Sequence, residues 1–161
     1  MVPLETTLRI NAPVERCFDL ARSVEVHVAR KRHWGEEAVA LGGVTTGLMG
    51  LGDRVTWRAR HFGVRQHLTS EITAYDRPRY FQDRMLRGAF AFMEHDHYFT
   101  STADGATEMR DVFRFAAPLG WIGRIVEAWV LRRYMARLLD ERNAVIREVA
   151  EGQDWRIYLG N

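Results

Sequence analysis

The chain has very little of several features that mark whole classes of protein. Its one cysteine, Cys17, excludes an internal disulfide framework and any multi-cysteine metal site. It has neither a charged-then-apolar N-terminal leader nor an apolar run of about 18 residues. We therefore expect a protein that is neither secreted nor membrane-spanning, and the low cysteine content predicts the reducing cytoplasm as its compartment.

Lysine is also nearly absent, since Lys31 is the only lysine among the 23 Lys and Arg residues. The 21 acidic residues are spread among the arginines, so no basic stripe of the kind that binds phosphate groups forms. We predict no nucleic-acid partner.

Apolar residues are plentiful: 47% of the 161 residues are hydrophobic and 11% are aromatic. This composition supplies one sizeable core and leaves little room for a second. We predict a single domain over residues 1–161, while the sequence leaves the oligomeric state open.

Apolar residues recur with a period of two in some segments and with helical spacing in others, which predicts the order of elements. We expect a strand at 4–10, a helix capped by Asn11, a short helix from Ser23 to His27 and a weaker strand at 34–41. The later elements are strands at 53–62, 64–74 and 79–87, a hairpin between 90 and 115, a helix over 121–151, and a tail at 154–161 partly pinned by Trp155 and Tyr158.

This order separates the helices from a run of about six antiparallel strands, which is typical of the α+β class. A terminal helix of roughly 30 residues spans about 45 Å, enough to cross a whole sheet. A curved sheet covered by one helix leaves a hollow between them, and we expect that hollow to be a ligand site.

A glycine-rich segment at 42–52 separates the weak strand from the next one. No Lys-Ser or Lys-Thr pair follows it, and a strand rather than a helix comes next, so it does not match a phosphate-binding loop. We expect the segment to tuck Leu48, Met49 and Leu51 against the mouth of a cavity.

Several short segments in a fixed order carry a resemblance to a known family. They are Asn11-Ala12-Pro13 after the opening strand, Gly52-Asp53-Arg54-Val55-Thr56-Trp57, Ile72-Thr73-Ala74-Tyr75-Asp76-Arg77-Pro78 leading into Tyr80-Phe81, His95-Asp96-His97-Tyr98-Phe99, Thr107-Glu108-Met109-Arg110-Asp111, and Pro118-Leu119-Gly120. Over essentially the whole chain they resemble the polyketide cyclase/dehydrase and lipid transport group of the START-like, birch-pollen-allergen-like helix-grip (SRPBCC) superfamily.

This resemblance implies a helix-grip fold. In that fold, a curved antiparallel sheet of about six to seven strands wraps around a long C-terminal helix, two short helices follow the first strand, and a cavity lies inside. The superfamily includes lipid carriers, hormone receptors and aromatic cyclases, so the fold alone does not settle the function.

Polar residues in the hairpin between 90 and 115 are expected to point into the hollow. A three-residue loop at its turn places His97 opposite Asp111 and His95 opposite Phe113, and a corner at Gly88 brings Asp83 near His95. A two-residue loop would shift the register by one. The shifted register would turn inward the residues Glu94, Asp96 and Tyr98.

The charges on the second strand of the hairpin favour the first register. Glu108, Arg110 and Arg114 belong on the solvent side, so Asp111 must lie inside.

In that register, His95, His97, Asp83 and Asp111 are candidate catalytic residues, able to act as general acid and base on a carbonyl-bearing ligand. The same residues can instead form a hydrogen-bonded unit that fixes the cavity wall and orients a ligand. Two histidines at i, i+2 and an aspartate could also supply three metal ligands, but nothing in the sequence selects this over simple pairing. We predict no metal ion and no cofactor.

The hypothesis for function is the binding, transport or sequestration of a small hydrophobic molecule such as a lipid or a polyketide-like compound. Its alternatives are a cyclase or dehydratase that uses the His/Asp cluster, and a protein-interaction domain without a ligand. The predicted cavity residues are Trp57, His61, Phe81, Asp83, Met85, Met93, His95, His97, Asp111, Phe113 and Trp129.

Overall fold

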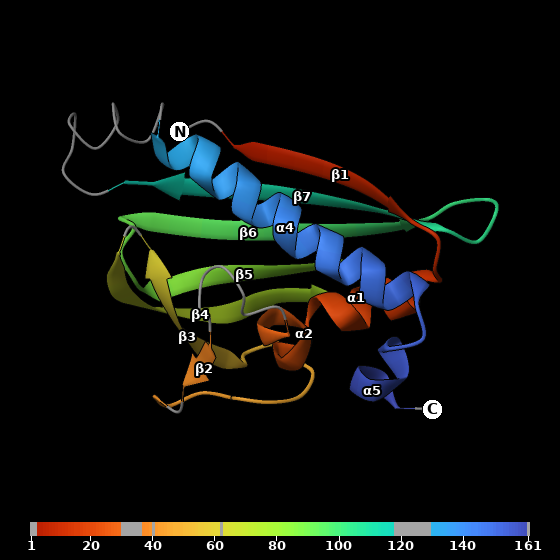
Figure 1. Cartoon of the computed structure of the whole chain (residues 1–161), viewed down its shortest axis with the longest axis horizontal. Helices are drawn as coiled ribbons and strands as arrows, with labels where there is room; N and C mark the ends of the chain where they lie inside the picture. Colours follow the sequence, from red (N-terminus) through yellow and green to blue (C-terminus); the bar gives the residue numbers. More distant parts are fainter. Residues whose placement is uncertain (1–2, 30–36, 40, 62, 118–129, 161) are drawn as a thin grey trace.

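The computed structural model describes residues 3–29, 37–39, 41–61, 63–117 and 130–160. In these residues an antiparallel sheet curves around a long helix, α4, which lies across one face of the sheet (Figure 1). The α+β helix-grip fold that the sequence predicts is confirmed. The elements are β1 Leu4–Ile10, α1 Val14–Ala21, α2 Val24–Val28, β2 Glu37–Val39, β3 Arg54–His61, β4 Val64–Asp76, β5 Tyr80–Arg87, β6 Phe92–Ser101, β7 Thr107–Ala116, α4 Arg132–Glu151 and α5 Trp155–Leu159.

Within the residues that the structure describes, the sheet has seven strands in the order β1-β7-β6-β5-β4-β3-β2. From β2 to β7, strands that are neighbours in the sheet are also consecutive in the chain, and a turn or a loop joins each one to the next. The first strand instead pairs with the last, antiparallel to β7. The two short helices α1 and α2 follow β1 and lie at one end of the curved face (Figure 1).

The two short helices begin differently, one with a side-chain cap and one without. Ser23 caps α2, since its side-chain oxygen accepts a hydrogen bond from the backbone N–H of Val26. The predicted cap of α1 by Asn11 is wrong: Pro13 occupies the N-cap position, and the backbone N–H of Asn11 donates to the carboxylate of Glu151.

The C-terminal helix ends at Glu151, before Gly152, as predicted. Its predicted start at Trp121 lies outside the described residues, and the described helix begins at Arg132. The tail expected after it contains a short helix, α5, in which Trp155 and Tyr158 pack against the core.

The core lies between the concave face of the sheet and the helices, in two clusters. The larger centres on Phe18 of α1, which makes edge-to-face contacts with Tyr75, Phe81 and Phe99 at ring-centroid distances of 5.3–5.5 Å. The smaller cluster joins the N-terminal half of α4 to β1, β6 and β7. Its buried members are Leu4, Met93, Phe113, Phe115, Met135 and Leu139.

The glycine-rich segment is only partly tucked in. Met49 is buried, but Leu48 and Leu51 are 37% and 66% exposed, so the expectation for these two leucines is wrong. The backbone explains the difference. Gly47 and Met49 both form backbone hydrogen bonds with the segment 22–24, and Leu48 forms a bridge with Ser23, so neighbouring side chains point to opposite sides and only Met49 points inward.

Of the helices that the structure describes, none is at once long and apolar enough to cross a membrane.

Candidate functional site

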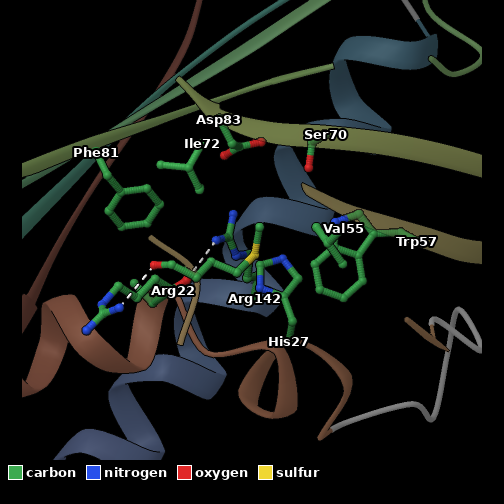
Figure 2. A pocket seen from close by; sticks show the side chains of 11 residues that line it. Arg22, His27, Val55, Trp57, Ser70, Ile72, Phe81, Asp83 and Arg142 are labelled. Atoms are coloured by element: carbon green, nitrogen blue, oxygen red, sulfur yellow. Dashed lines mark hydrogen bonds between the residues drawn. The ribbon is translucent and has the colours of Figure 1, made fainter. Parts of the chain in front are cut away.

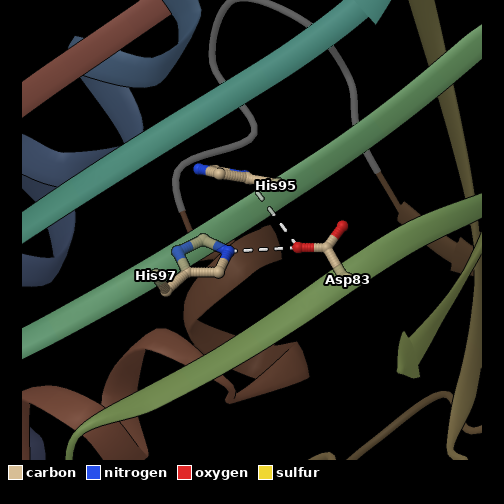
Figure 3. A group of neighbouring side chains, drawn as sticks. All are labelled: Asp83, His95 and His97. Atoms are coloured by element: carbon tan, nitrogen blue, oxygen red, sulfur yellow. Dashed lines mark hydrogen bonds and ion pairs between the residues drawn. The ribbon is translucent and has the colours of Figure 1, made fainter. Parts of the chain in front are cut away.

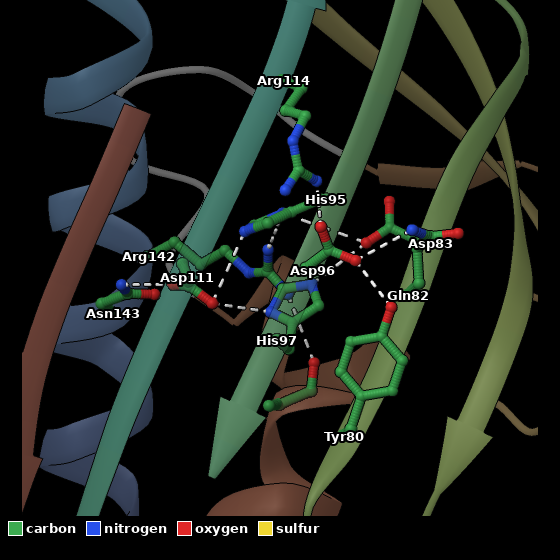
Figure 4. Close-up of polar contacts among 11 residues, drawn as sticks. Tyr80, Gln82, Asp83, His95, Asp96, His97, Asp111, Arg114, Arg142 and Asn143 are labelled. Carbon is green, nitrogen blue, oxygen red and sulfur yellow. Dashed lines mark hydrogen bonds and ion pairs between the residues drawn. The ribbon is translucent and has the colours of Figure 1, made fainter. Parts of the chain in front are cut away.

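A buried polar cluster lies on the concave face where β5, β6 and β7 run side by side (Figure 4). His97 is paired with Asp111 and His95 with Phe113, and His95 also lies opposite Asp83. Gly105 adopts a left-handed backbone conformation in the turn of the hairpin. The three-residue-loop register is therefore confirmed, and the alternative that turns Glu94 and Tyr98 inward is excluded.

His97 is held between two carboxylates. Its Nδ1 lies 2.8 Å from Oδ1 of Asp111 and its Nε2 lies 3.0 Å from Oδ1 of Asp83. Burial alone would raise the pKa of each aspartate, but the hydrogen bonds and charges of the histidines outweigh it. They lower the pKa of Asp83 to about 2 and that of Asp111 well below its usual value.

Both carboxylates are therefore ionised acceptors at neutral pH, and each ring nitrogen of His97 must donate to one of them. Burial would lower the pKa of His97, but Asp111 and Asp83 outweigh it and raise that pKa. His97 is the charged histidine of the pair, and its ring stacks on Phe81 at a centroid distance of 4.2 Å.

His95 is neutral. Burial and the charge of His97 lower its pKa to about 4, against the opposing effect of Asp111 and Asp83. Its Nδ1 accepts a hydrogen bond from Nη1 of Arg142 at 3.3 Å, because a guanidinium can only donate. The proton of its ring then sits on Nε2, 3.5 Å from Oδ1 of Asp111.

Asp111 is the anchor of the cluster and is 1% exposed. Its second oxygen, Oδ2, accepts a hydrogen bond of 2.6 Å from the side-chain amide of Asn143 on α4. The same amide nitrogen donates to the hydroxyl of Thr6 on β1. These bonds tie α4 to the sheet at the position of the two histidines.

A small cavity adjoins the cluster, between the sheet, α2 and α4 (Figure 2). Its volume is about 40 Å³, room for a few water molecules. Apolar side chains from the strands form one wall, and two arginines, a histidine and an aspartate give it polar groups. The lining residues are Ala21, Arg22, His27, Met49, Val55, Trp57, Ser70, Ile72, Phe81, Asp83 and Arg142.

The predicted cavity residues fall into separate groups. Trp57, Phe81 and Asp83 line this cavity. His95, His97 and Asp111 are buried in the adjoining cluster, and Met85, Met93 and Phe113 pack in the smaller core cluster instead. The side chain of His61 and the whole of Trp129 lie outside the described residues. For all of them, a role in ligand binding stays a prediction.

Arg142 and His27 are cavity residues that the sequence analysis did not select. His27 stacks on Trp57 at a centroid distance of 4.6 Å. Arg142 reaches both His95 and the backbone carbonyl of Ala21. A signal for Arg142 existed: it lies one position before Asn143 and three after Leu139, both buried on the face of α4 that meets the sheet.

A second polar group lies on the outer face of the sheet, behind the cluster (Figure 4). Asp96 is only 3% exposed there, because the side chains of Tyr80, Gln82 and Arg114 all donate hydrogen bonds to its carboxylate. Burial would raise the pKa of Asp96, but these bonds outweigh it and lower that pKa.

Comparison with known proteins agrees with this architecture. The model of the polyketide cyclase/dehydrase and lipid transport family matches residues 1–151. No curated protein shows significant sequence similarity to the chain.

Solved structures share the fold at low sequence identity. The protein TTHA0849 from Thermus thermophilus superimposes with a TM-score of 0.72 at 17% identity, covering 91% of this chain and 95% of that one. The Zhui aromatase/cyclase from a Streptomyces species gives 0.64 at 16% identity, with coverages of 92% and 95%. A START superfamily protein from Mycobacterium smegmatis gives 0.65 at 10% identity, with coverages of 89% and 96%. At these identities the likeness concerns the fold.

Proposed function

Because the chain belongs to the polyketide cyclase/dehydrase and lipid transport family, we propose that it binds a small hydrophobic molecule between the concave face of the sheet and α4. The observation that carries the proposal is the composition of the cavity wall. Trp57, Ile72 and Phe81 give the sheet side an apolar surface. Asp83, which pairs with Ile72 in the sheet, and Arg142, from α4, add charged groups to the lining. A mostly apolar wall with few polar groups is typical of small-molecule sites.

The polar side of the cavity favours a ligand that carries a hydrogen-bond acceptor. The described contacts of Arg142 are long, 3.3 Å to His95 and 3.4 Å to the carbonyl of Ala21, and its Nε is buried with no hydrogen-bond partner. A carbonyl or carboxylate oxygen on the ligand would give this guanidinium a stronger acceptor than either. We therefore infer an apolar ligand with an oxygen-bearing group, oriented by Arg142.

The size of the cavity adds a requirement. Drug-sized ligands occupy pockets of about 300–1,000 Å³, far above the 40 Å³ of this cavity. Binding therefore needs the wall to move. The long, flexible side chains of the lining are Arg22, Met49 and Arg142. Arg22 is held by two hydrogen bonds to Asp19, so displacement of Met49 and Arg142 is the simplest way to widen the space.

The test is native mass spectrometry and solvent extraction of the purified protein, followed by titration with panels of lipids and aromatic polyketides. We expect a bound small molecule in the wild type and its loss from Trp57→Ala, because Trp57 is a large part of the apolar wall. Trp155→Ala is the matched control, since Trp155 lies on α5, packs under Arg16 and does not line the cavity.

The remaining outcomes separate the alternatives. A protein that binds no compound from any panel would contradict the proposal and favour an interaction domain. If His97→Ala keeps the ligand but loses its conversion to product, the protein is an enzyme of the cyclase or dehydratase type. The observation that favours an enzyme is the position of Asp83, which lines the cavity and is also hydrogen-bonded to His97.

A further inference from the structure

The side chains of Asp83, His95 and His97 place three possible metal ligands close together on the concave face (Figure 3). Oδ1 of Asp83 lies 3.0 Å from Nε2 of His97 and 3.9 Å from Nδ1 of His95, and the three ligand atoms all lie within 4.8 Å of one another. We propose that these residues form a binding site for one divalent transition-metal ion, with zinc as its probe.

The strands provide this geometry directly. His95 and His97 are two residues apart on β6, so their side chains share the concave face, and Asp83 lies opposite His95 on β5. Metal–ligand bonds of about 2.0–2.2 Å place ligand atoms about 3–3.5 Å apart around the ion. The 3.0 Å between Asp83 and His97 already matches that spacing, and the ring of His95, whose Nδ1 lies 3.9 Å from Asp83, has to move closer to the other two ligands.

Asp111 supplies the supporting contact that such sites use. Its Oδ1 lies 2.8 Å from Nδ1 of His97 and 3.5 Å from Nε2 of His95, the ring nitrogens that point away from Asp83. A carboxylate in this position orients the imidazoles. The metal ion would bind Nδ1 of His95 through its lone pair, and Nε2 of His97 once that nitrogen has released the proton it shares with Asp83, because metal ligands bind in their deprotonated form. Asn143 in turn holds Asp111 through a hydrogen bond of 2.6 Å.

Arg142 competes with a metal ion for one of these ligands. Its Nη1 donates to Nδ1 of His95, the same lone pair that the ion would take. Metal binding therefore requires Arg142 to swing away from His95 along the cavity that it already lines. Because both hydrogen bonds of Arg142 are long and therefore weak, this movement costs little free energy.

Three protein ligands leave at least one coordination position open, as in catalytic rather than structural zinc sites. Two imidazoles and one carboxylate favour zinc, iron or cobalt over magnesium or calcium, which prefer oxygen ligands. Since Asp83 also lines the cavity, a small molecule bound there would have access to the open position.

The first test is isothermal titration calorimetry, in which zinc chloride is titrated into untagged protein that has been treated with a chelator and then freed of it. We expect one ion per chain with a dissociation constant of about 10 µM or tighter. Cobalt(II) added instead should give visible absorption bands of a low-coordinate complex, which zinc then displaces. A wild-type protein that binds neither ion would overturn the proposal without any variant.

Variants then locate the ion. Asp83→Asn keeps the size and one acceptor oxygen of the side chain but removes the charge, and we expect it to weaken zinc binding by about 100-fold or more. His67→Gln is the control for surface histidines, since the side chain of His67, on β4, lies outside the cluster, and it should leave binding unchanged. Retention in Asp83→Asn, or loss in His67→Gln, would place the ion elsewhere and contradict the proposal.

The variant Arg142→Met distinguishes a metal site from a cluster with a purely structural role. It removes the competing cation, so we expect zinc to bind about threefold more tightly or better, because like charges repel. Weaker zinc binding in this variant would contradict the assignment of His95 as a ligand. Circular dichroism of each variant confirms that it is folded before titration.

Discussion

Replacing Asp111 by asparagine tests the charge distribution of the buried cluster most directly. The two oxygens of Asp111 face two donors, the ring of His97 on one side and the amide of Asn143 on the other. An asparagine has one acceptor oxygen and one NH₂ group. Whichever way it is oriented, one of the two donors meets another donor.

The magnitude follows from these contacts. A hydrogen bond to a charged group contributes about 1.5–3 kcal/mol, and a buried donor left without an acceptor costs about 1–3 kcal/mol. The cluster also keeps a charged His97 with one carboxylate instead of two. We expect Asp111→Asn to lower the free energy of unfolding by about 3–5 kcal/mol, the range for breaking a buried ion pair.

The assay is urea unfolding at pH 7 with a chelator present, followed by circular dichroism and tryptophan fluorescence. Glu108→Gln is the matched control, because Glu108 is on the same strand but exposed, and its effect should stay within about 0.5 kcal/mol. Asn143→Ala should cost clearly less in the Asp111→Asn background than in the wild type, since the two side chains share one hydrogen bond. A loss below about 1 kcal/mol in Asp111→Asn would refute the charged His97.

Three further predictions concern the rest of the fold. Phe18→Ala removes the ring at the centre of the larger core cluster and should cost about 3–5 kcal/mol in urea unfolding; an effect under about 1.5 kcal/mol would show that the site collapses around the gap. Gly43→Ala puts a methyl group 2.4 Å from the carbonyl oxygen of Arg54 and should cost about 1–3 kcal/mol, whereas Gly50→Ala, whose nearest neighbour is 3.7 Å away, should be close to neutral. The pKa of Asp96 is lowered in the fold, so the stability that its ionised form provides is present above the unfolded pKa of about 3.9 and is lost as the pH falls through the lower folded value. The difference in unfolding free energy between wild type and Asp96→Asn should therefore shrink from pH 5 to acid pH; a constant difference would contradict the lowered pKa.

The hairpin of β6 and β7 shows how far local pattern reaches. Charges at Glu108, Arg110 and Arg114 favour the solvent side, and this preference orients Asp111 inward. The length of the loop around Gly105 then sets the register between the two strands. Once the register is set, His97 is opposite Asp111 without further information. The central pair of the candidate site was therefore predictable from the sequence.

Other parts of the site depend on contacts between distant segments. Arg142 meets His95 across 47 positions of the chain. Helical periodicity places Arg142 beside the buried face of α4, but its partner depends on how α4 crosses the sheet. The burial of Asp96 on the outer face is a second case. It follows from Tyr80, Gln82 and Arg114, whose side chains converge on one carboxylate from the two strands that flank β6.

The sequence by itself determined the order of strands and helices, the curved antiparallel sheet and the inward direction of the two histidines, because alternation and turn residues act over a few positions. Only the tertiary structure decided the size of the cavity, the pairing of Arg142 with His95 and the placement of Asp83 and Asp111 on opposite sides of one imidazole. These depend on distances of a few ångströms between elements far apart in the chain, and packing sets such distances rather than pattern.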